Sequence, residues 1–263
     1  MSAVMLIRRL FYMCFKRETE YKLNFILLCV SVAPLRLMFL LFALVLSSKI
    51  EVLYGWNAWD IAFLYGMYVV SYSLAQIFFK PFRNLDKLIT HGELDKFFTK
   101  PQPVLFSLIF YNIHIMEIFS QLVPSLIILI LACFQVSARW NLFKVLILTA
   151  GIAGGTLIQA GIFVFIGCTS IFMFNSSWLG DLYYAFRDFL SYPLVIFGKK
   201  MLLFLTCVLP LAFVNYYPAR YILEKENKDA LINFMTLPVS LVISVLICKL
   251  WKISCKHYTS SGS

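Results

Sequence analysis

The sequence lacks the short motifs that usually mark an enzyme. The nearest approach to the phosphate-binding loop GxxxxGK[ST] is Gly198-Lys199-Lys200, which has neither the first glycine nor the hydroxyl residue. The HExxH zinc motif and the GxSxG nucleophile elbow are also missing. The 3 histidines, His91, His114 and His257, are too far apart in sequence to suggest a shared metal. We therefore expect no catalytic site, no metal site and no cofactor in this chain.

Paired cysteines are lacking as well. None of the 7 cysteines forms a CxxC pair, and most lie inside apolar stretches. Cysteine in such surroundings behaves as a small apolar residue. We interpret these residues as packing groups rather than as metal ligands or disulfide partners.

Charged residues are scarce and apolar residues are in excess. Only 14% of the chain is charged, whereas 61% is hydrophobic, against about 45–50% apolar residues in a typical soluble domain. A helix needs about 20 mostly apolar residues to cross a bilayer. Six stretches approach or exceed this length, at 23–47, 58–79, 104–133, 142–173, 201–217 and 230–248, with limits defined only to within several residues. An alternative start for the fifth stretch lies nearer Ser191. They are too long and too uniformly apolar for the strands of an outer-membrane barrel.

The sequence thus predicts an all-α polytopic membrane protein with six transmembrane helices. We expect a transmembrane domain over 23–250, preceded by a cytoplasmic segment over 1–22 and followed by a cytoplasmic tail over 251–263. The first 22 residues are too charged for a cleavable signal peptide, and the apolar stretch after them is too long for a signal core.

Acidic residues are outnumbered by basic ones, which gives a formal net charge of +10. In a soluble protein this excess would suggest nucleic acid, but in a membrane protein basic residues mark the cytoplasmic loops. They gather before the first stretch, over 80–103, over 174–200 and after the last stretch. This pattern predicts that both termini lie in the cytoplasm, and it indicates the lipid bilayer rather than nucleic acid as a partner.

The N-terminal segment VMLIRRLFYMCFKR over 4–17 has an amphipathic pattern. Its apolar residues recur at helical spacing and basic residues flank them, at Ile7, Leu10, Phe11, Cys14 and Phe15 against Arg8, Arg9, Lys16 and Arg17. Such a helix lies along the inner membrane interface. The alternative is an unstructured basic flank.

The loop over 80–103 is too long and too well patterned for a simple connection. Asn84 suits a helix N-cap, and Gly92 suits a helix stop. A second helical turn is expected from Leu94, Phe97 and Phe98, and it ends before Pro101. Short helices with apolar positions and mixed charge are typical of segments that dock into a groove on a partner. The alternative is a solvated basic loop.

Polar residues line one face of two apolar stretches. Tyr65, Tyr68, Tyr72 and Gln76 share a face of the second stretch, and Ser107, Tyr111, His114, Glu117, Gln121 and Ser125 share a face of the third. Arg36 lies deep in the first stretch. Because a charge in the bilayer centre is costly, we hypothesise that Arg36 and Glu117 pair or that both line a translocation cavity. The candidate cavity residues are Arg36, Tyr65, Tyr68, Tyr72, His114, Glu117 and Gln121; the alternative is a structural salt bridge or ordinary packing.

Two stretches resemble a known family. GELDKFFTKPQPVLF over Gly92–Phe106 is similar to the G-x-L-D-x-x-L-x-[KR]-P segment of type-2 ABC exporter permeases, in a branch of six-span bacterial proteins. FRDFLSYPLVIFGKKMLLFLTCVLPLAFVNYYPA over Phe186–Ala219 resembles a second segment of the same branch. Phe97 and Phe98 stand where that branch more often has aliphatic residues.

The resemblance implies a permease subunit of an exporter in the bacterial cytoplasmic membrane. Such a permease dimerises with a second copy or with a sister permease, and it is driven by two copies of a separate ATPase subunit that holds ATP and Mg²⁺. The loop 80–103 would then be the coupling helix, the segment 1–22 an elbow helix, and 215–229 a pair of short helices or a re-entrant segment at the outer face. The ATPase-coupling residues would be Leu85, Asp86, Leu88, Gly92, Glu93, Leu94, Asp95, Phe97, Lys100 and Pro101.

Other functions remain possible from the residues alone. A secondary transporter or channel that is not driven by ATP would be expected to show inverted repeats and broken central helices, and the two halves show no clear repeat. A membrane scaffold or an intramembrane enzyme is the third class, but the enzyme would need a cluster of catalytic residues that the sequence does not offer.

Overall fold

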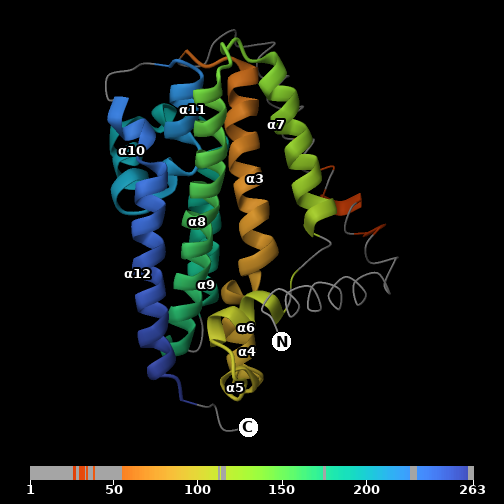
Figure 1. Cartoon of the computed structure of the whole chain (residues 1–263), viewed down its shortest axis with the longest axis vertical. Coiled ribbons are helices and arrows are strands. Elements are labelled where there is room, and N and C mark those ends of the chain that lie inside the picture. Colours follow the sequence, from red (N-terminus) through yellow and green to blue (C-terminus); the bar gives the residue numbers. More distant parts are fainter. Residues whose placement is uncertain are drawn as a thin grey trace.

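The computed structural model describes residues 55–111, 113, 117–173, 176–225 and 230–259, with scattered positions between 26 and 38. Every regular element in these ranges is helical. The longest helices lie side by side along the molecule (Figure 1), and they are α3 (Ala58–Arg83), α7 (Val123–Gln135), α8 (Leu142–Met173) and α12 (Thr236–Lys256).

Four helical stretches of the described residues are long and apolar enough to cross a membrane. They are Ala58–Thr90, Ile118–Gln135, Leu142–Met173 and Thr236–Lys256. A bent pair, Ser177–Ser191 with Leu194–Cys207, makes a fifth if the two parts form one span. The predicted all-helical, multi-span class is therefore confirmed. The first predicted stretch, 23–47, and the elbow segment, 1–22, lie outside the continuously described residues.

The core lies around α3. Most of its residues are buried, and it packs against α7 on one side and α8 on the other. Glycines of α8 allow these close approaches, since a methyl group added at Gly155 would lie 2.8 Å from the carbonyl oxygen of Val214. One added at Gly167 would lie 2.8 Å from the carbonyl oxygen of Phe82. The glycines of α8 thus allow the backbones of neighbouring helices to pack closely, as small residues commonly do in membrane helices.

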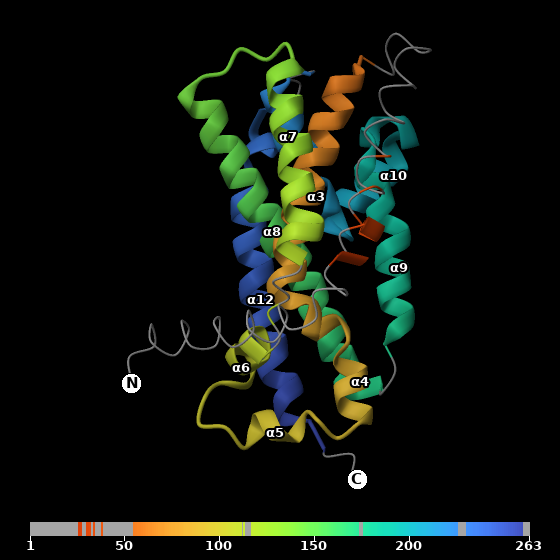
Figure 2. The ribbon, with the colours of Figure 1, turned by 90° about the vertical axis from the view of Figure 1, so that its right-hand side faces the viewer.

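The fifth stretch, 201–217, does not form a single helix, and the alternative start nearer Ser191 agrees better with the second half of the bent pair, Leu194–Cys207. The chain instead forms α9 (Ser177–Arg187), two short 3-10 turns and α10 (Gly198–Cys207), with a bend of 115° between the two halves. The break between the halves lies at Tyr192 and Pro193. Gly198 has φ of 81°, which suits glycine at the junction between the second 3-10 turn and α10. A third 3-10 turn, Pro210–Phe213, then separates α10 from α11 (Tyr216–Ile222). The segment 174–200, expected as a loop, is therefore largely helical, and α9 runs along the bundle (Figure 2).

The third stretch, 104–133, is also divided. Its first part is α6 (Val104–Tyr111), which lies near one end of the bundle. The candidate span begins at Ile118 with a π-helical turn over Ile118–Leu122 that leads into α7.

The bundle has two different ends, visible in Figures 1 and 2. The end that carries α4 (Leu85–Thr90), α5 (Asp95–Phe98) and α6 is called the loop end, and α12 also finishes there. The opposite end, where α3 and α8 begin and α11 lies, is called the cavity end.

Candidate functional site

The loop end is built around a helix–turn–helix connection. Asn84 stands at the N-cap of α4, but its side chain accepts a hydrogen bond from Arg83 instead of capping the helix. Gly92 follows the end of α4 with φ of 65°, and its N–H donates to the carbonyl of Ile89 at 3.0 Å. A left-handed residue just beyond a helix is the usual place for glycine. The predicted stop at Gly92 is therefore confirmed.

The apolar residues of this connection face their own bundle. Leu85, Leu94 and Phe97 are at most 1% exposed, and Ile89 is buried with them. Side chains this deeply buried are not available to a second protein. Leu85, Leu94 and Phe97 are therefore packed within their own chain in this conformation, and their predicted part in coupling stays a prediction.

The solvent side of the connection carries the remaining predicted residues. Glu93, Lys100 and Pro101 are exposed, and Asp86, Leu88, Gly92 and Asp95 are partly exposed. Lys96 donates to Glu93 at 2.9 Å, and this ion pair lowers the pKa of the Glu93 carboxyl. Phe98 is 38% exposed, so an aromatic ring stands among these polar groups. This exposed set is the part of the loop that a partner can reach.

Two spans, α8 and α12, pack against the residues that lead into the connection. The close approach at Gly167 brings α8 against the last residues of α3. The ring of Phe82 meets Trp251 of α12 edge to face, with centroids 5.2 Å apart. Aromatic pairs of this kind contribute about 0.5–1.5 kcal/mol beyond their burial.

The second residue after α12, Tyr258, contacts the loop itself. The hydroxyl of Tyr258 donates to Asp95 at 2.8 Å, and its ring is stacked on Phe98 with centroids 4.9 Å apart. Burial, followed by the hydrogen bond to Asp95, raises the pKa of Tyr258 to about 12. The chain beyond the last span is thus attached to the most exposed aromatic residue of the loop.

An ion pair joins the end of α3 to the start of the next candidate span. Lys80 lies in the last turn of α3, and its ammonium group donates to Glu117 at 2.6 Å. Glu117 is the residue immediately before the π-helical turn. The other oxygen of Glu117 accepts a hydrogen bond from Gln121. Sequence reasoning offered Arg36 as the partner of Glu117 and missed Lys80, although positions 80 and 117 flank the loop. Arg36 and His114 lie outside the described residues.

The tyrosine row of α3 lies inside the bundle. Tyr65, Tyr68 and Tyr72 are each less than 5% exposed, and their rings pack against one another in sequence order. The guanidinium of Arg187 lies over the ring of Tyr72 at 5.0 Å. The row is therefore packed within the chain, and in this conformation it does not line an open path.

A buried polar chain adjoins this row, and sequence reasoning missed it. Tyr183 of α9 donates to Gln159 of α8 at 3.0 Å, and Gln159 donates to Ser71 of α3 at 2.8 Å. Three helices are thereby linked by hydrogen bonds in their apolar surroundings. The signal in the sequence was slight, since Ser71 and Gln159 are single polar residues within apolar stretches, whereas Tyr183 lies in the segment 174–200 that was expected as a loop.

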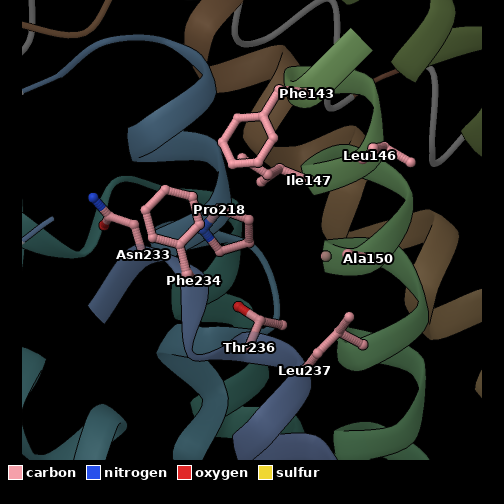
Figure 3. Close-up of a pocket in the computed structure, with 10 residues that line it drawn as sticks. Phe143, Leu146, Ile147, Ala150, Pro218, Asn233, Phe234, Thr236 and Leu237 are labelled. Carbon is pink, nitrogen blue, oxygen red and sulfur yellow. The ribbon is translucent and has the colours of Figure 1, made fainter. Parts of the chain in front are cut away.

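The cavity end contains two cavities, one on each side of α11. The first has a volume of about 210 Å³, and Figure 3 shows its apolar lining, which is Phe143, Leu146, Ile147, Ala150, Gly151, Pro218, Asn233, Phe234, Thr236 and Leu237. The second has a volume of about 380 Å³ and is lined by Gly55, Trp56, Val195, Tyr216, Arg220, Glu224 and Lys225. The second cavity therefore combines aromatic rings with charged groups.

Comparison with known families identifies the chain. The model of the ABC-2 family transporter proteins matches residues 32–262, which is most of the sequence. The chain therefore belongs to this family and is a multi-pass membrane component of a transport system. No curated protein and no solved structure matches it.

Proposed function

We propose that the chain is the permease subunit of an ATP-binding cassette exporter. It forms the translocation path as a dimer, with a second copy or a sister permease, and two copies of a separate ATPase subunit bind ATP and Mg²⁺. In this proposal it has six spans and lies in a bacterial cytoplasmic membrane with both termini in the cytoplasm, so that the loop end faces the ATPase. Family membership supports this, because ABC-2 permeases usually work with an ATPase partner.

The observation that carries the proposal is the two-sided construction of the loop over 80–103. Its buried side, with Leu85 and Phe97, is fixed to the bundle, whereas its exposed side offers Glu93, Phe98 and Lys100. A solvated linker would not bury its apolar residues so completely. A segment that transmits force needs a face for the partner and a firm attachment to the spans.

The attachment suggests how movement would pass from the ATPase to the membrane. The loop continues directly from α3, and the ion pair between Lys80 and Glu117 closes it at the start of the next span. A displacement of the loop would therefore move α3 and α7 together. Packed elements transmit such displacements because their interiors resist deformation.

The translocation path is proposed to include the tyrosine row with Glu117 and Gln121. Buried ionisable residues in membrane spans usually serve a transport path or pair with one another. Tyr65, Tyr68 and Tyr72 are packed within the present conformation, so they would line the path only after the helices around α3 separate.

Co-purification tests the proposal. The tagged chain is extracted in mild detergent and the eluate is assayed for ATPase activity, for the wild type and for the variant Glu93→Ala, Phe98→Ala, Lys100→Ala. We expect an ATPase subunit with the wild type and at least a tenfold loss with the variant, on the order of the loss of one interface hot spot. The control is Arg139→Ala, at the cavity end, which should retain the ATPase.

If no ATPase accompanies the wild-type chain, the proposal fails. A secondary transporter or channel that is not driven by ATP then becomes the leading function. If the ATPase is present but the variant retains it fully, the exposed side of the loop is not its binding site.

A further inference from the structure

The cavity of about 380 Å³ at the cavity end has the size of a ligand site. Pockets for small molecules usually have volumes of about 300–1,000 Å³, and they combine apolar walls with a few polar groups. The wall here is formed by Trp56 and Tyr216, whose rings are stacked with centroids 6.0 Å apart. The polar groups come from the end of α11 and the residues after it.

Each of the two carboxylates near this cavity, Glu224 and Asp60, forms an ion pair with a lysine. Glu224 pairs with Lys144 at 2.7 Å, and Asp60 pairs with Lys225 at 2.7 Å. Lys225 also donates to the carbonyl of Gly55 at 2.7 Å. Both acids are thus already neutralised by cations other than Arg220.

Arg220 is the remaining cation of the lining. Its Nε–H is buried and has no hydrogen-bond partner in the described part of the chain. An unmade hydrogen bond at a buried donor costs about 1–3 kcal/mol, and more for a charged group. A ligand with a hydrogen-bond acceptor would satisfy this buried N–H. An anionic acceptor would bind most strongly, because the guanidinium is positively charged.

The backbone beside Arg220 is also unusual. Glu224 has φ of 55°, which is uncommon for a residue other than glycine. Such conformations cluster at ligand sites, where the surrounding structure holds them in place. Here the conformation turns the chain directly after α11, so that Lys225 reaches Asp60 while Arg220 stays at the cavity.

We propose that this cavity binds a phosphate group, and that Arg220 is its principal ligand. The planar guanidinium matches the oxygens of a phosphate with two parallel hydrogen bonds. The cavity is larger than a lone phosphate needs, and the rings of Trp56 and Tyr216 form an apolar wall for what the phosphate carries. Tryptophan and tyrosine are enriched where membrane proteins meet the lipid headgroups. A lipid headgroup and free phosphate share this chemistry, and the experiment below separates them.

The proposal goes beyond the exporter function and does not depend on an ATPase. Its test is binding to the purified full chain in an uncharged detergent. Three probes are compared by native mass spectrometry and by ligand-induced thermal stabilisation, namely dioctanoyl phosphatidic acid, dioctanoylglycerol and inorganic phosphate. The first two differ only in the phosphate group.

We expect phosphatidic acid to bind and dioctanoylglycerol not to bind. Arg220→Gln should weaken phosphatidic acid binding by at least about tenfold, as expected when a charged hydrogen-bond partner is removed. The matched control is Arg139→Gln, which removes an exposed cation close enough to act on Glu224 but not itself part of the lining, and it should bind like the wild type. Arg220→Lys keeps the positive charge but not the planar guanidinium, so phosphatidic acid binding should fall to an intermediate extent. If Arg220→Gln does not fold, the binding of Arg220→Lys tests the proposal in its place.

Binding of inorganic phosphate as tightly as phosphatidic acid would assign the site to free phosphate, and binding of the lipid alone would assign it to a headgroup. Equal binding of phosphatidic acid and dioctanoylglycerol would overturn the proposal. So would unchanged binding in Arg220→Gln and Arg220→Lys. Because no ATPase takes part, these outcomes are separate from those that test the exporter function.

Discussion

The loop end and the cavity end of the bundle are packed in different ways. At the loop end, short helices are fixed to the spans by buried aromatic residues, an ion pair and the bond from Tyr258 to Asp95. At the cavity end, short helices border two cavities, and among the described residues the buried Nε of Arg220 and both amide atoms of Asn233 have no partner. The loop end has one such atom in the same residues, the hydroxyl oxygen of Ser107 in α6. The first arrangement suits a part that moves together with the spans. The second leaves room for a ligand or for rearrangement.

The largest effect should come from breaking the ion pair at the loop end. Lys80→Met leaves the carboxylate of Glu117 without its cation, and Glu117 is only 7% exposed. Breaking a buried ion pair costs about 3–5 kcal/mol, and the partial exposure of Lys80 makes this an upper limit. Thermal unfolding of the purified chain in detergent measures the loss.

Lys96→Met is the matched control for this change. Its pair with Glu93 is exposed on both sides, at 40% and 48%, so its loss should lower the unfolding temperature far less than the loss of the pair at Lys80. Equal losses in the two variants would show that the pair at Lys80 is not a special connection. Partial recovery in the exchange of Lys80→Glu with Glu117→Lys would confirm the pairing.

The next largest effect should come from disturbing the close approach between α8 and the end of α3 at Phe82. In Gly167→Ala the new methyl group would lie 2.8 Å from the backbone oxygen of Phe82, which cannot rotate away. Overpacking of this kind costs about 1–3 kcal/mol, and ATPase stimulation should fall with it if the loop transmits force. In Gly180→Ala the methyl group meets nothing within 4 Å, so this variant should unfold at or above the wild-type temperature. Similar behaviour of the two variants would contradict the tight packing of α8 against the loop.

A pair of asparagines tests the looser packing of the cavity end. Asn215 is buried and donates to the carbonyls of Leu64 at 3.0 Å and Leu190 at 2.7 Å. Asn215→Leu should therefore cost about 1–3 kcal/mol, because two buried acceptors lose their donor. Asn233 is equally buried, but neither of its amide atoms has a partner in the described residues. Asn233→Leu should leave the unfolding temperature unchanged or raise it, and a large loss would show that Asn233 has an essential contact.

The smallest effect is a pH dependence at Tyr258. Its raised pKa, about 12, means that the folded chain keeps the hydroxyl proton more firmly than the unfolded chain, whose tyrosines have a pKa of about 10. As pH rises from about 10 to 12, the unfolded state loses this proton first, so stability should fall over that window. The difference in unfolding temperature between wild type and Tyr258→Phe should change with pH only in this range. A pH-independent difference would argue against the bond to Asp95.

The sequence predicted the helices whose apolar stretches are uninterrupted. The helix α8 has the bounds that hydropathy predicted, and its glycines act as close-packing residues. The helix α12 begins six residues and ends eight residues later than the predicted stretch 230–248, because a 3-10 turn occupies Ala230–Phe234. The stretch 201–217 failed because apolar composition does not show where a helix bends. The interruptions follow single residues instead: Pro193 lies at the bend, Gly198 at the start of α10 and Pro210 at the start of the 3-10 turn after α10.

The candidate site was only partly predictable for a different reason. Helical periodicity identified Leu94 and Phe97 as one apolar face, but periodicity does not distinguish burial in the same chain from burial in a partner. The partner of Glu117 was missed because pairing across a loop depends on how the spans are arranged. The cavity beside Arg220 left no signal in the sequence, since its walls come from three separate segments, around Trp56, Val195 and Arg220.

The stacking of Tyr258 on Phe98 has a practical consequence for experiments on this protein. An affinity tag or fluorescent reporter fused shortly after Tyr258 would emerge next to the loop rather than in open solvent. Such a fusion is poorly suited to purifying the chain with a subunit that binds there. The same position is well suited to a distance probe, because a dye attached there would report directly when that surface becomes covered.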